Sequence, residues 1–366
     1  MTVPFVDLVA QHEEVAEEVG LGLQDVFARA AFVGGAEVDA FEREYAAYVG
    51  TAHCVGVGNG TDALELALRA VGVTPGGEVI LPANTFIATA EAVSRIGARP
   101  VVVDVDDEFL LIDPEQVARA VTARTQAIVP VHLFGQTAFV ERLQDAAGGI
   151  PIVEDAAQSQ GALRHGRPAG SLGLVSATSF YPGKNLGAAG DAGSVMTDDP
   201  RIAETVRVLA AHGSPRKYVH DVVGMNSRLD TIQAVYLRAK LSRLEKWNQL
   251  RREAAARYGQ LLAPLPGVRV PHSADGNHDV WHLYVVRSQH RDRLLTDLAA
   301  SGIGAGVHYP TPVHLTPAYA HLGLGAGTCP VAEQAAREIL SLPMFPHLAS
   351  EQQERVAAGV AASLGS

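Results

Sequence analysis

Residues 176–195 read SATSFYPGKNLGAAGDAGSV, and they place a single lysine, Lys184, between an apolar β-like run and a glycine-rich segment. Lysine is scarce in this chain of 366 residues, and it occurs elsewhere only at Lys217, Lys240 and Lys246. The last two lie in an amphipathic helical pattern over residues 228–262, which predicts that both face solvent. Lys217 stands in a loop-like segment, either as plain surface or as a contact for an anion.

Lys184 differs from these because a buried strand would deliver it into surroundings that are poor in water. Desolvation lowers the pKa of a lysine, and a lysine is a nucleophile at neutral pH only when its pKa is lowered. Taken alone, the segment fits a loop lysine that points outward equally well. Other parts of the sequence decide between the two interpretations.

Composition excludes several classes of protein. The formal net charge of −11 disfavours binding to nucleic acid or to an anionic membrane, since both need clustered cations. Two cysteines, Cys54 and Cys329, are too few for a disulfide framework and lack the spacing of a zinc site, so no metal is expected. The N-terminus has no signal peptide, and no apolar run reaches about 18 residues. We therefore expect a soluble, cytoplasmic protein.

Short β-rich runs alternate with amphipathic helical patterns over residues 50–200, which predicts βαβ units. The expected fold is α/β, with a mostly parallel seven-stranded sheet and helices on both faces. The segment PLPGVRVP, residues 264–271, punctuates the chain before a strand-like WHLYVVR. We predict a large domain with an N-terminal arm over residues 1–250, and a smaller C-terminal α/β domain over residues 251–366.

Glycines end the strand-like run in CVGVGNGTDALELAL, residues 54–68, directly before a helical pattern. Glycine lets the backbone approach a ligand, and the N–H groups at a helix N-terminus suit a phosphate, although such glycines often form plain turns. The third glycine of a dinucleotide-binding G-x-G-x-x-G is missing, which argues against an oxidoreductase of that type. The spacing favours a single phosphate.

The run IPIVEDAAQSQGA, residues 150–162, carries Asp155 at the end of an apolar strand, where open α/β sheets bind ligands. Capping of the following turn is the commoner role for such a carboxylate. The alternative is that Asp155 pairs with a cationic ring nitrogen and that Gln158 reaches a ring hydroxyl. A phosphate cradle, an acid and a lysine, in this order, are what pyridoxal 5′-phosphate (PLP) needs.

The chain resembles the DegT/DnrJ/EryC1/StrS sugar aminotransferases, which have the type I, aspartate aminotransferase-like PLP fold. The resemblance covers essentially the whole chain and is carried by VPFVDL, GNGTDALELAL, ANTFIATAEAV, PVHLFGQ, VEDAAQSQGA, SFYPGKNLGAAGDAG, MNSRLDTIQAVYLRAKL and GVHYPTPVHLTPAY. It implies that Lys184 bonds covalently to PLP and acts as the catalytic base, and that Asp155 pairs with the ring nitrogen.

The same resemblance implies the other cofactor contacts and a homodimer with shared active sites. Phe86 would stack on the ring and Gln158 would lie near its hydroxyl. The phosphate would be held by Gly60, Thr61, Ser179 and, from the neighbouring subunit, Asn226. From the residues alone, an aromatic in the position of Phe86 is more often part of the core, and the alternative for Asn226 is a role as an N-cap.

The segments around residues 217–248 and 306–319 look like those of aminotransferases that act on C3 of dTDP-3-keto-6-deoxyhexoses. This likeness implies a sugar site formed by Tyr181, Lys217, His308 and Tyr309, with Arg228 as a diphosphate contact. In loop positions next to a proline, His308 and Tyr309 fit a structural role equally well. Gln160 and Thr316 depart from the pattern, which would have histidine and glutamine there.

The sequence therefore predicts PLP-dependent transamination of a nucleotide-linked 3-keto sugar with L-glutamate as amino donor. The alternatives are a 4-keto nucleotide sugar or a keto-inositol as acceptor. A PLP-dependent sugar dehydratase is disfavoured because such relatives have histidine in place of Lys184, and a PLP-binding regulator is disfavoured because no DNA-binding module is visible.

Overall fold

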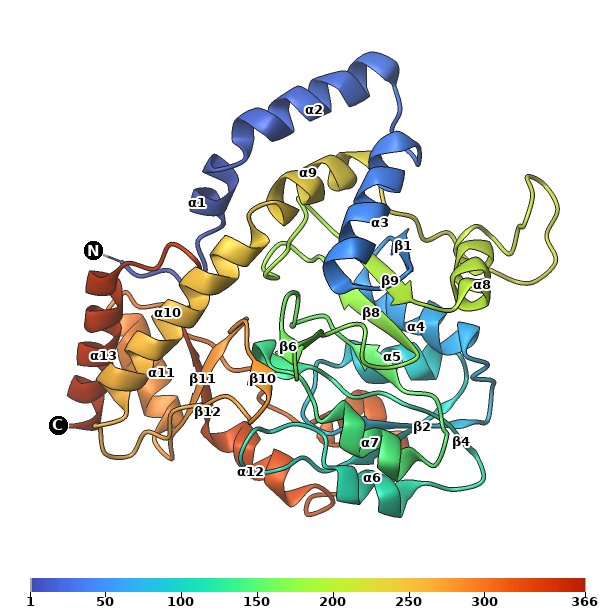
Figure 1. The fold of residues 1–366 in the computed structure, drawn as a ribbon. Helices are drawn as coiled ribbons and strands as arrows, with labels where there is room; N and C mark the ends of the chain where they lie inside the picture. Colours follow the sequence, from blue (N-terminus) through green and yellow to red (C-terminus); the bar gives the residue numbers. More distant parts are fainter. Residues whose placement is uncertain (1, 366) are drawn as a thin grey trace.

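The computed structural model describes residues 2–365, and its central feature is a twisted sheet surrounded by helices (Figure 1). One hydrogen-bonded ladder has the order β1-β9-β8-β5, and a second has the order β3-β2-β4. Isolated parallel bridges, Ile128 to Ile152 and Val131 to Asp155, connect the two ladders. The strands are β1 (His53–Val57), β2 (Glu78–Pro82), β3 (Arg99–Val103), β4 (Thr125–Ile128), β5 (Val153–Asp155), β8 (Val175–Ser179) and β9 (Gly193–Thr197).

The predicted α/β class is confirmed, but the sheet is mixed. Strand β9 runs antiparallel to both of its neighbours, β1 and β8, whereas β5 pairs with β8 in parallel and β2 pairs in parallel with β3 and β4. The description of the sheet as mostly parallel is therefore corrected at β9, and the pairing falls into two ladders joined by bridges.

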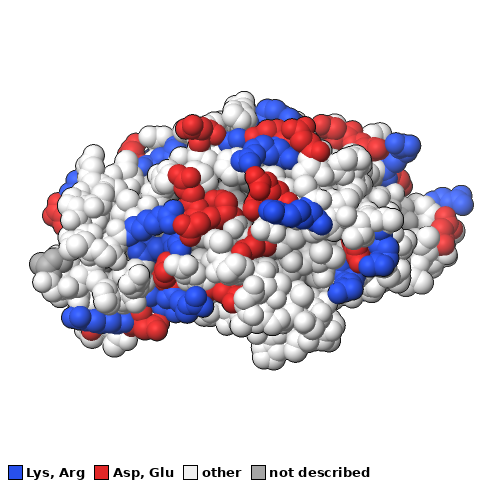
Figure 2. Space-filling view, turned by 90° about the horizontal axis from the view of Figure 1, so that it is seen from below, with Lys and Arg blue, Asp and Glu red and all other residues white. Residues whose placement is uncertain are grey.

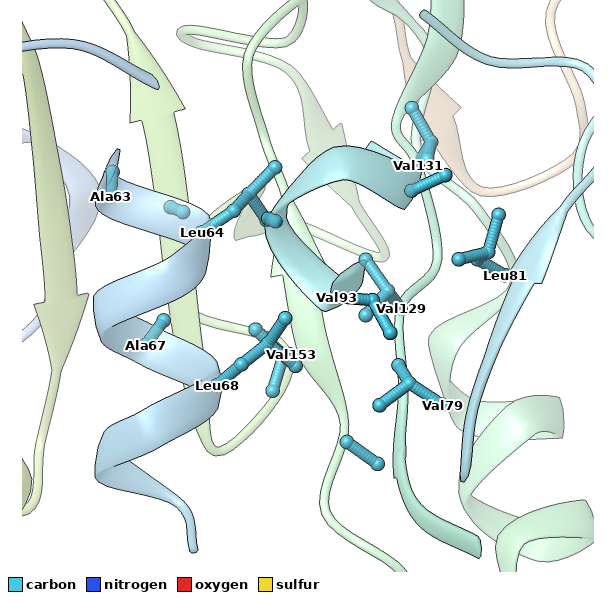
Figure 3. Close-up of a cluster of buried hydrophobic side chains, with 14 of the residues drawn as sticks. Ala63, Leu64, Ala67, Leu68, Val79, Leu81, Val93, Val129, Val131 and Val153 are labelled. Atoms are coloured by element: carbon cyan, nitrogen blue, oxygen red, sulfur yellow. The ribbon is translucent and has the colours of Figure 1, made fainter. Parts of the chain in front are cut away.

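Helices cover both faces of the sheet because successive strand residues point to opposite sides. In β2, Val79 and Leu81 pack in a cluster with Leu64 and Leu68 (Figure 3), whereas Ile80 packs in a separate cluster on the other face. The surrounding helices are α3 (Ala36–Val49), α4 (Gly60–Ala70), α5 (Ala88–Arg95), α6 (Pro114–Ala120), α7 (Val140–Ala147) and α8 (Pro200–Ala210), with a short η1 (Leu133–Gly135).

The C-terminal part has its own core around an antiparallel pair, β11 and β12. The predicted boundary at residue 250 falls within one continuous helix, α10, and the two-domain division remains a prediction. The remaining elements are α9 (Thr231–Leu241), α10 (Leu244–Leu262), β10 (Asn277–His278), β11 (Tyr284–Arg287), α11 (Arg291–Ala300), η2 (Val313–Leu315), η3 (Pro317–Leu322), α12 (Pro330–Glu338), β12 (Ile339–Leu342) and α13 (Ser350–Leu364), with the short strands β6 (Leu163–Arg164) and β7 (Arg167–Pro168).

The N-terminal segment joins this C-terminal part before it forms two helices. Val3 forms a parallel bridge with Ile303, and the chain then continues into α1 (Leu8–Glu13) and α2 (Ala16–Arg29). Helix α2 extends beside α9 at the upper edge of the molecule in Figure 1. Its Leu21 and Phe27 are exposed to solvent.

The prediction that Lys240 faces solvent is wrong, whereas Lys246 is exposed as expected. Only 2% of Lys240 is accessible. Its Nζ donates a hydrogen bond of 2.8 Å to the carbonyl of Gly187, in the loop that carries Lys184. Helix α9 packs against this loop, so its charged residue at position 240 faces the interior of the protein.

The surface contains no large basic area on the side that Figure 2 shows. There, acidic and basic side chains lie next to one another. Ion pairs of the described residues include Arg69 with Glu65 and Arg124 with Glu78. Among residues 2–365, no helix combines the length and apolar character that crossing a bilayer requires.

Candidate active site

The carboxyl ends of β2, β5 and β8 converge on one large cavity of about 780 Å³. Open α/β sheets bind their ligands at this edge. The first turn of α4, the loop between β8 and β9, and two segments of the C-terminal part complete the wall. The predicted site residues that line the cavity are Gly60, Thr61, Phe86, Asp155, Gln158, Ser179, Tyr181, Lys184, His308 and Tyr309.

Lys184 is fixed in place by the residues on either side of it. Its backbone N–H donates to the carbonyl of Tyr181 at 2.8 Å, which closes a tight turn. The next residue, Asn185, is buried and donates its side-chain amide to Asn248 Oδ1 at 2.8 Å and to the Val280 carbonyl at 3.0 Å. Desolvation in the cavity lowers the pKa of Lys184 to about 8, although the carboxylate of Asp155 opposes the shift. Because Lys184 lines the cavity, the alternative of a loop lysine that points outward is wrong.

Asp155 and Glu154 project to opposite sides of β5 and do different things. Asp155 lines the cavity, where its carboxylate accepts a hydrogen bond from Thr89 Oγ1 at 2.8 Å and another from the Ala157 N–H at 3.2 Å. The second bond is the turn cap that the sequence allowed, so Asp155 caps the turn and also faces the cavity. Burial raises its pKa, while the bond from Thr89 opposes the rise.

Glu154 organises the sheet edge behind the cavity. Its carboxylate, which is fully buried, accepts bonds from His132 Nε2 at 2.7 Å and from the backbone N–H groups of Gly170, Leu172 and Gly173. These bonds fix the register of β5 and hence the direction in which Asp155 points.

The phosphate cradle expected at the start of α4 is present in shape. Asn59 caps the helix by accepting the Asp62 N–H at 2.8 Å, and Gly60 lies against Ser179 at the end of β8. A Cβ on Gly60 would lie 2.6 Å from Ser179 Cβ, so only glycine permits this approach. The first N–H groups of a helix lack intrahelical acceptors and suit an anion.

Two aromatic rings and an amide form another part of the cavity wall. Gln158 Oε1 accepts the Phe134 N–H at 2.7 Å, and its Nε2 donates to Tyr309 Oη at 3.2 Å. Phe86 packs against Tyr309 with ring centroids 5.5 Å apart. Phe86 is 53% exposed and lines the cavity, so its interpretation as a core residue is wrong.

His308 is held by two contacts that the sequence did not reveal. Its Nδ1 lies 2.8 Å from Ser341 Oγ, and its ring stacks on Phe5 with a centroid distance of 5.5 Å. Phe5 also lines the cavity. Burial lowers the pKa of His308 and raises that of Tyr309 to about 12, so both side chains are neutral at pH 7.

Asn226, Lys217 and Arg228 do not line the cavity, and all three are exposed. Asn226 is not an N-cap, because α9 begins at Thr231 with Asp230 in the capping position. Lys217 lies in the segment that follows α8, which projects away from the body of the molecule in Figure 1. Within one chain, the structure does not bring these residues to the others.

The two departures from the family pattern also lie outside the cavity lining. Gln160 is buried and donates to the Ser179 carbonyl at 2.8 Å and to Thr178 Oγ1 at 3.0 Å. Thr316 Oγ1 donates to the Val313 carbonyl at 2.7 Å. Neither side chain is placed to contact a sugar in this cavity.

Sequence reasoning missed Thr89, which holds Asp155, and His282, which lines the cavity from the start of WHLYVVR. Thr89 lies three residues after Phe86, in the first turn of α5, so a hydroxyl this close to an expected cofactor contact is a usable signal. His282 offers none, because it reaches the cavity through packing between distant segments.

Comparison with known proteins gives consistent matches over the whole length. The model of the DegT/DnrJ/EryC1/StrS aminotransferase family matches residues 13–361. The chain is 48% identical over 360 residues to the "erythromycin biosynthesis sensory transduction protein EryC1" of Saccharopolyspora erythraea, covering 98% of both chains. It is also 48% identical to a dTDP-3-amino-3,4,6-trideoxy-alpha-D-glucose transaminase of Streptomyces venezuelae, covering 97% of this chain and 94% of that protein. The crystal structure of S. venezuelae DesV in complex with a ketimine intermediate superposes with a TM-score of 0.96 at 47% identity, covering 99% of this chain and 98% of that one.

Proposed function

The chain belongs to the DegT/DnrJ/EryC1/StrS aminotransferase family, and from that premise we propose that it aminates C3 of a dTDP-linked 3-keto-6-deoxyhexose. It is a PLP-dependent aminotransferase with the α/β fold of this family. The observation that carries the proposal is the meeting of Lys184, Asp155 and the Gly60–Ser179 cradle in one cavity. The similarity to a transaminase named for a dTDP-3-amino sugar supports the choice of acceptor.

The residues of the cavity fit PLP. Gly60, Thr61 and Ser179 would hold its phosphate, Phe86 its ring face, and Gln158 its hydroxyl. When bound, PLP supplies an electron sink that stabilises negative charge at the carbon attached to the reacting nitrogen. Asp155, whose position is fixed by Thr89, would place its carboxylate beside the ring nitrogen and favour a positive charge there.

Lys184 is the group that binds the cofactor covalently and moves the proton. Its Nζ takes a proton from the α-carbon of the amino donor, for which we propose L-glutamate. With a pKa of about 8, a substantial fraction of the amine is unprotonated near neutral pH, so it can act as a base. In the second half of the reaction, the same amine delivers a proton to the sugar carbon that receives nitrogen.

His308, Tyr309 and Tyr181 form the part of the cavity wall that we assign to the sugar. Because His308 and Tyr309 are neutral, they can donate and accept hydrogen bonds with sugar hydroxyls. The cavity volume of about 780 Å³ lies in the range of small-molecule and cofactor sites.

Among the described residues, Lys184 and Arg95 are the lysine and arginine side chains of the cavity lining, and Lys184 is assigned to the cofactor rather than to a nucleotide diphosphate. Arg95 is paired with Asp62 at 3.1 Å and Glu65 at 2.8 Å. Two carboxylates, Glu91 and Asp191, line the same cavity. An anionic substrate would therefore require positive charge from another chain.

We propose a homodimer in which the partner completes each site. Asn226 of the partner subunit would reach the cofactor phosphate, and Lys217 of the partner subunit and Arg228 of the partner subunit would reach the nucleotide sugar. Apolar side chains that are exposed in one chain support a covered surface: Leu21, Phe27, Val222 and Val223. With its two buried free cysteines, the protein fits the reducing cytoplasm.

The shared site predicts complementation between two impaired variants. Arg228→Ala should raise KM for the nucleotide sugar about 10-fold or more, because a diphosphate loses its cationic partner. Mixed with Lys184→Ala and reassociated at random, it should recover about a quarter of the wild-type activity at low substrate. Half of the dimers are then mixed, and each contains one intact site.

A mixture of Lys184→Ala with the Lys184→Ala/Arg228→Ala double variant is the matched control, since no mixed dimer in it contains a working lysine. Activity is measured after dissociation and reassociation. If Lys184 and Arg228 served the same chain's site, the first mixture would show only the residual activity of its Arg228→Ala subunits, about a twentieth of the wild-type activity at low substrate, and the control would show none.

The proposed acceptor is tested by incubating the enzyme with glutamate and each candidate sugar, followed by mass spectrometry. Amination of a dTDP-3-keto-6-deoxyhexose, with release of 2-oxoglutarate, is expected. A product from only a 4-keto nucleotide sugar or a keto-inositol would select the alternative acceptor. If the protein bound the cofactor but converted none of the acceptors, a regulatory function would be favoured instead. The name of the S. erythraea relative suggests such a role for that relative.

A further inference from the structure

His282 lines the cavity, although the scheme proposed above gives it no role. It precedes β11 and comes from the C-terminal part of the chain. Its backbone is held on two sides. The buried guanidinium of Arg251 donates to the Trp281 carbonyl at 3.2 Å and to the His282 carbonyl at 3.4 Å. On the other side, Leu283 N–H bonds to the Phe134 carbonyl at 3.2 Å. The backbone position from which the imidazole extends is therefore fixed.

The hydrogen bonds around Asn185 determine which nitrogen of His282 carries the proton. The Val280 carbonyl can only accept, so the contact at 3.0 Å identifies the amide nitrogen of Asn185. The other atom of that amide, Oδ1, is then the acceptor that faces His282 Nδ1 at 3.1 Å. His282 therefore donates from Nδ1, and its Nε2 carries a lone pair.

Asn185 is held in this orientation by a second buried amide. Asn248 Oδ1 accepts from Asn185 at 2.8 Å, and Asn248 Nδ2 donates to the Gln160 carbonyl at 2.9 Å. Asn185 and Asn248 are almost completely inaccessible to solvent. The chain of bonds thus links the residue next to Lys184 to the imidazole across the cavity wall.

The charges near His282 point to Lys184 as its functional neighbour. Burial lowers the pKa of His282 well below its usual value, and the positive charges of Lys184 and Arg251 lower it further. Arg251 is committed to backbone carbonyls, and the Nδ1 atom of His308 faces Ser341. The carboxylate of Asp155 also acts on Lys184, and it opposes the lowering of the pKa of Lys184. His282 is thus a neutral acceptor within electrostatic range of a cavity ammonium.

We propose that His282 is a positioning residue for Lys184, whose ammonium donates a hydrogen bond to His282 Nε2 whenever the lysine is released from the cofactor. The four-carbon stem of lysine allows the small movement that this bond needs. The bond would hold the freed lysine beside the reacting carbon and stabilise its charged form. The inference deepens the proposed role of Lys184, and it does not depend on the identity of the sugar.

The test is the pKa of Lys184 in the cofactor-free protein, measured by competitive acetylation and mass spectrometry. His282→Phe removes the acceptor and should lower the pKa of Lys184 by about one to two units, as expected for loss of one hydrogen bond to a charged group. His282→Gln keeps an acceptor and should restore most of the wild-type value. Lys217 and Lys246, which are exposed, serve as references in the same sample and should not shift.

An unchanged pKa of Lys184 in folded His282→Phe would overturn the proposal. If that variant does not fold, nitrogen NMR of the cofactor-free wild-type protein decides, with His282→Gln providing the assignment. A neutral His282 protonated at Nδ1 supports the inference, and one protonated at Nε2 overturns it. Both measurements avoid turnover, so their failure is distinguishable from failure of the proposed sugar specificity.

Discussion

Lys184→Ala is expected to reduce turnover by about 10⁴-fold or more and to abolish covalent retention of the cofactor. The substitution removes both the amine that binds PLP and the base that moves the proton, and positioned proton transfer alone contributes about 10²–10⁴-fold. The wild-type enzyme, treated with borohydride and digested, should carry the cofactor mass on the peptide that contains Lys184. In the variant, no cofactor-modified form of this peptide should be found. Glutamate should also no longer change the visible absorption spectrum of the variant protein.

Lys246→Ala is the matched control for this experiment. Lys246 is exposed, lies 3.8 Å from Glu14 and is remote from the cavity lining. Its removal should leave both activity and cofactor attachment unchanged. A Lys184→Ala variant that kept the covalent cofactor, on Lys240 for example, would show that the assignment of the reactive lysine is wrong.

The sequence predicted the central part of the site because its residues follow successive strands of one sheet. The cradle, Asp155 and Lys184 come after β1, β5 and β8, and the ends of such strands meet at one edge. Their proximity therefore follows from topology. Which face of a helix becomes covered does not follow from periodicity, and for this reason Lys240 was assigned to solvent although it supports the loop of Lys184.

The orientation of β9 shows another limit of the sequence pattern. The run GSVMT of β9 is mostly apolar and would be buried whichever way the strand ran. Composition therefore cannot distinguish parallel from antiparallel pairing. The connection from β8 was the available signal. Parallel neighbours need a crossover, usually a helix, whereas residues 180–192 contain none. That connection is occupied by the turn of Lys184 instead.

Residues that reach the cavity from the C-terminal part were predictable only through resemblance. His308 and Tyr309 are identified in this way, whereas His282, and Phe5 from the N-terminal segment, are not. Both depend on contacts between segments that are far apart in the sequence, such as Phe5 with His308 and His282 with Asn185, 97 residues away. A single sequence contains no local pattern for such contacts. Asn226, Lys217 and Arg228 lie outside the cavity of their own chain, so a single chain cannot show their role.

Asp155→Asn is expected to retain the cofactor but to lose about 10²–10⁴-fold in turnover, with little change in KM. Asparagine has nearly the same shape, and its Oδ1 can still accept the bond from Thr89 or from the Ala157 N–H. A neutral amide cannot stabilise a positive charge on the ring nitrogen, so the electron sink weakens while the binding contacts remain. Single-turnover kinetics with glutamate measure this step directly.

Thr89→Val separates the charge of Asp155 from its orientation. This variant keeps the carboxylate and removes one hydrogen bond, which opposes the rise in the pKa of Asp155 that burial causes. Its pKa should rise further, and the rate should fall far less than in Asp155→Asn and mainly at low pH, where the carboxyl becomes protonated. Because the loss would appear as pH falls through the raised pKa, the pH–rate profile distinguishes the two variants.

If Asp155→Asn stayed within about threefold of the wild-type rate at pH 7, the carboxylate would be only a turn cap, and the charge needed at the ring would have to come from elsewhere.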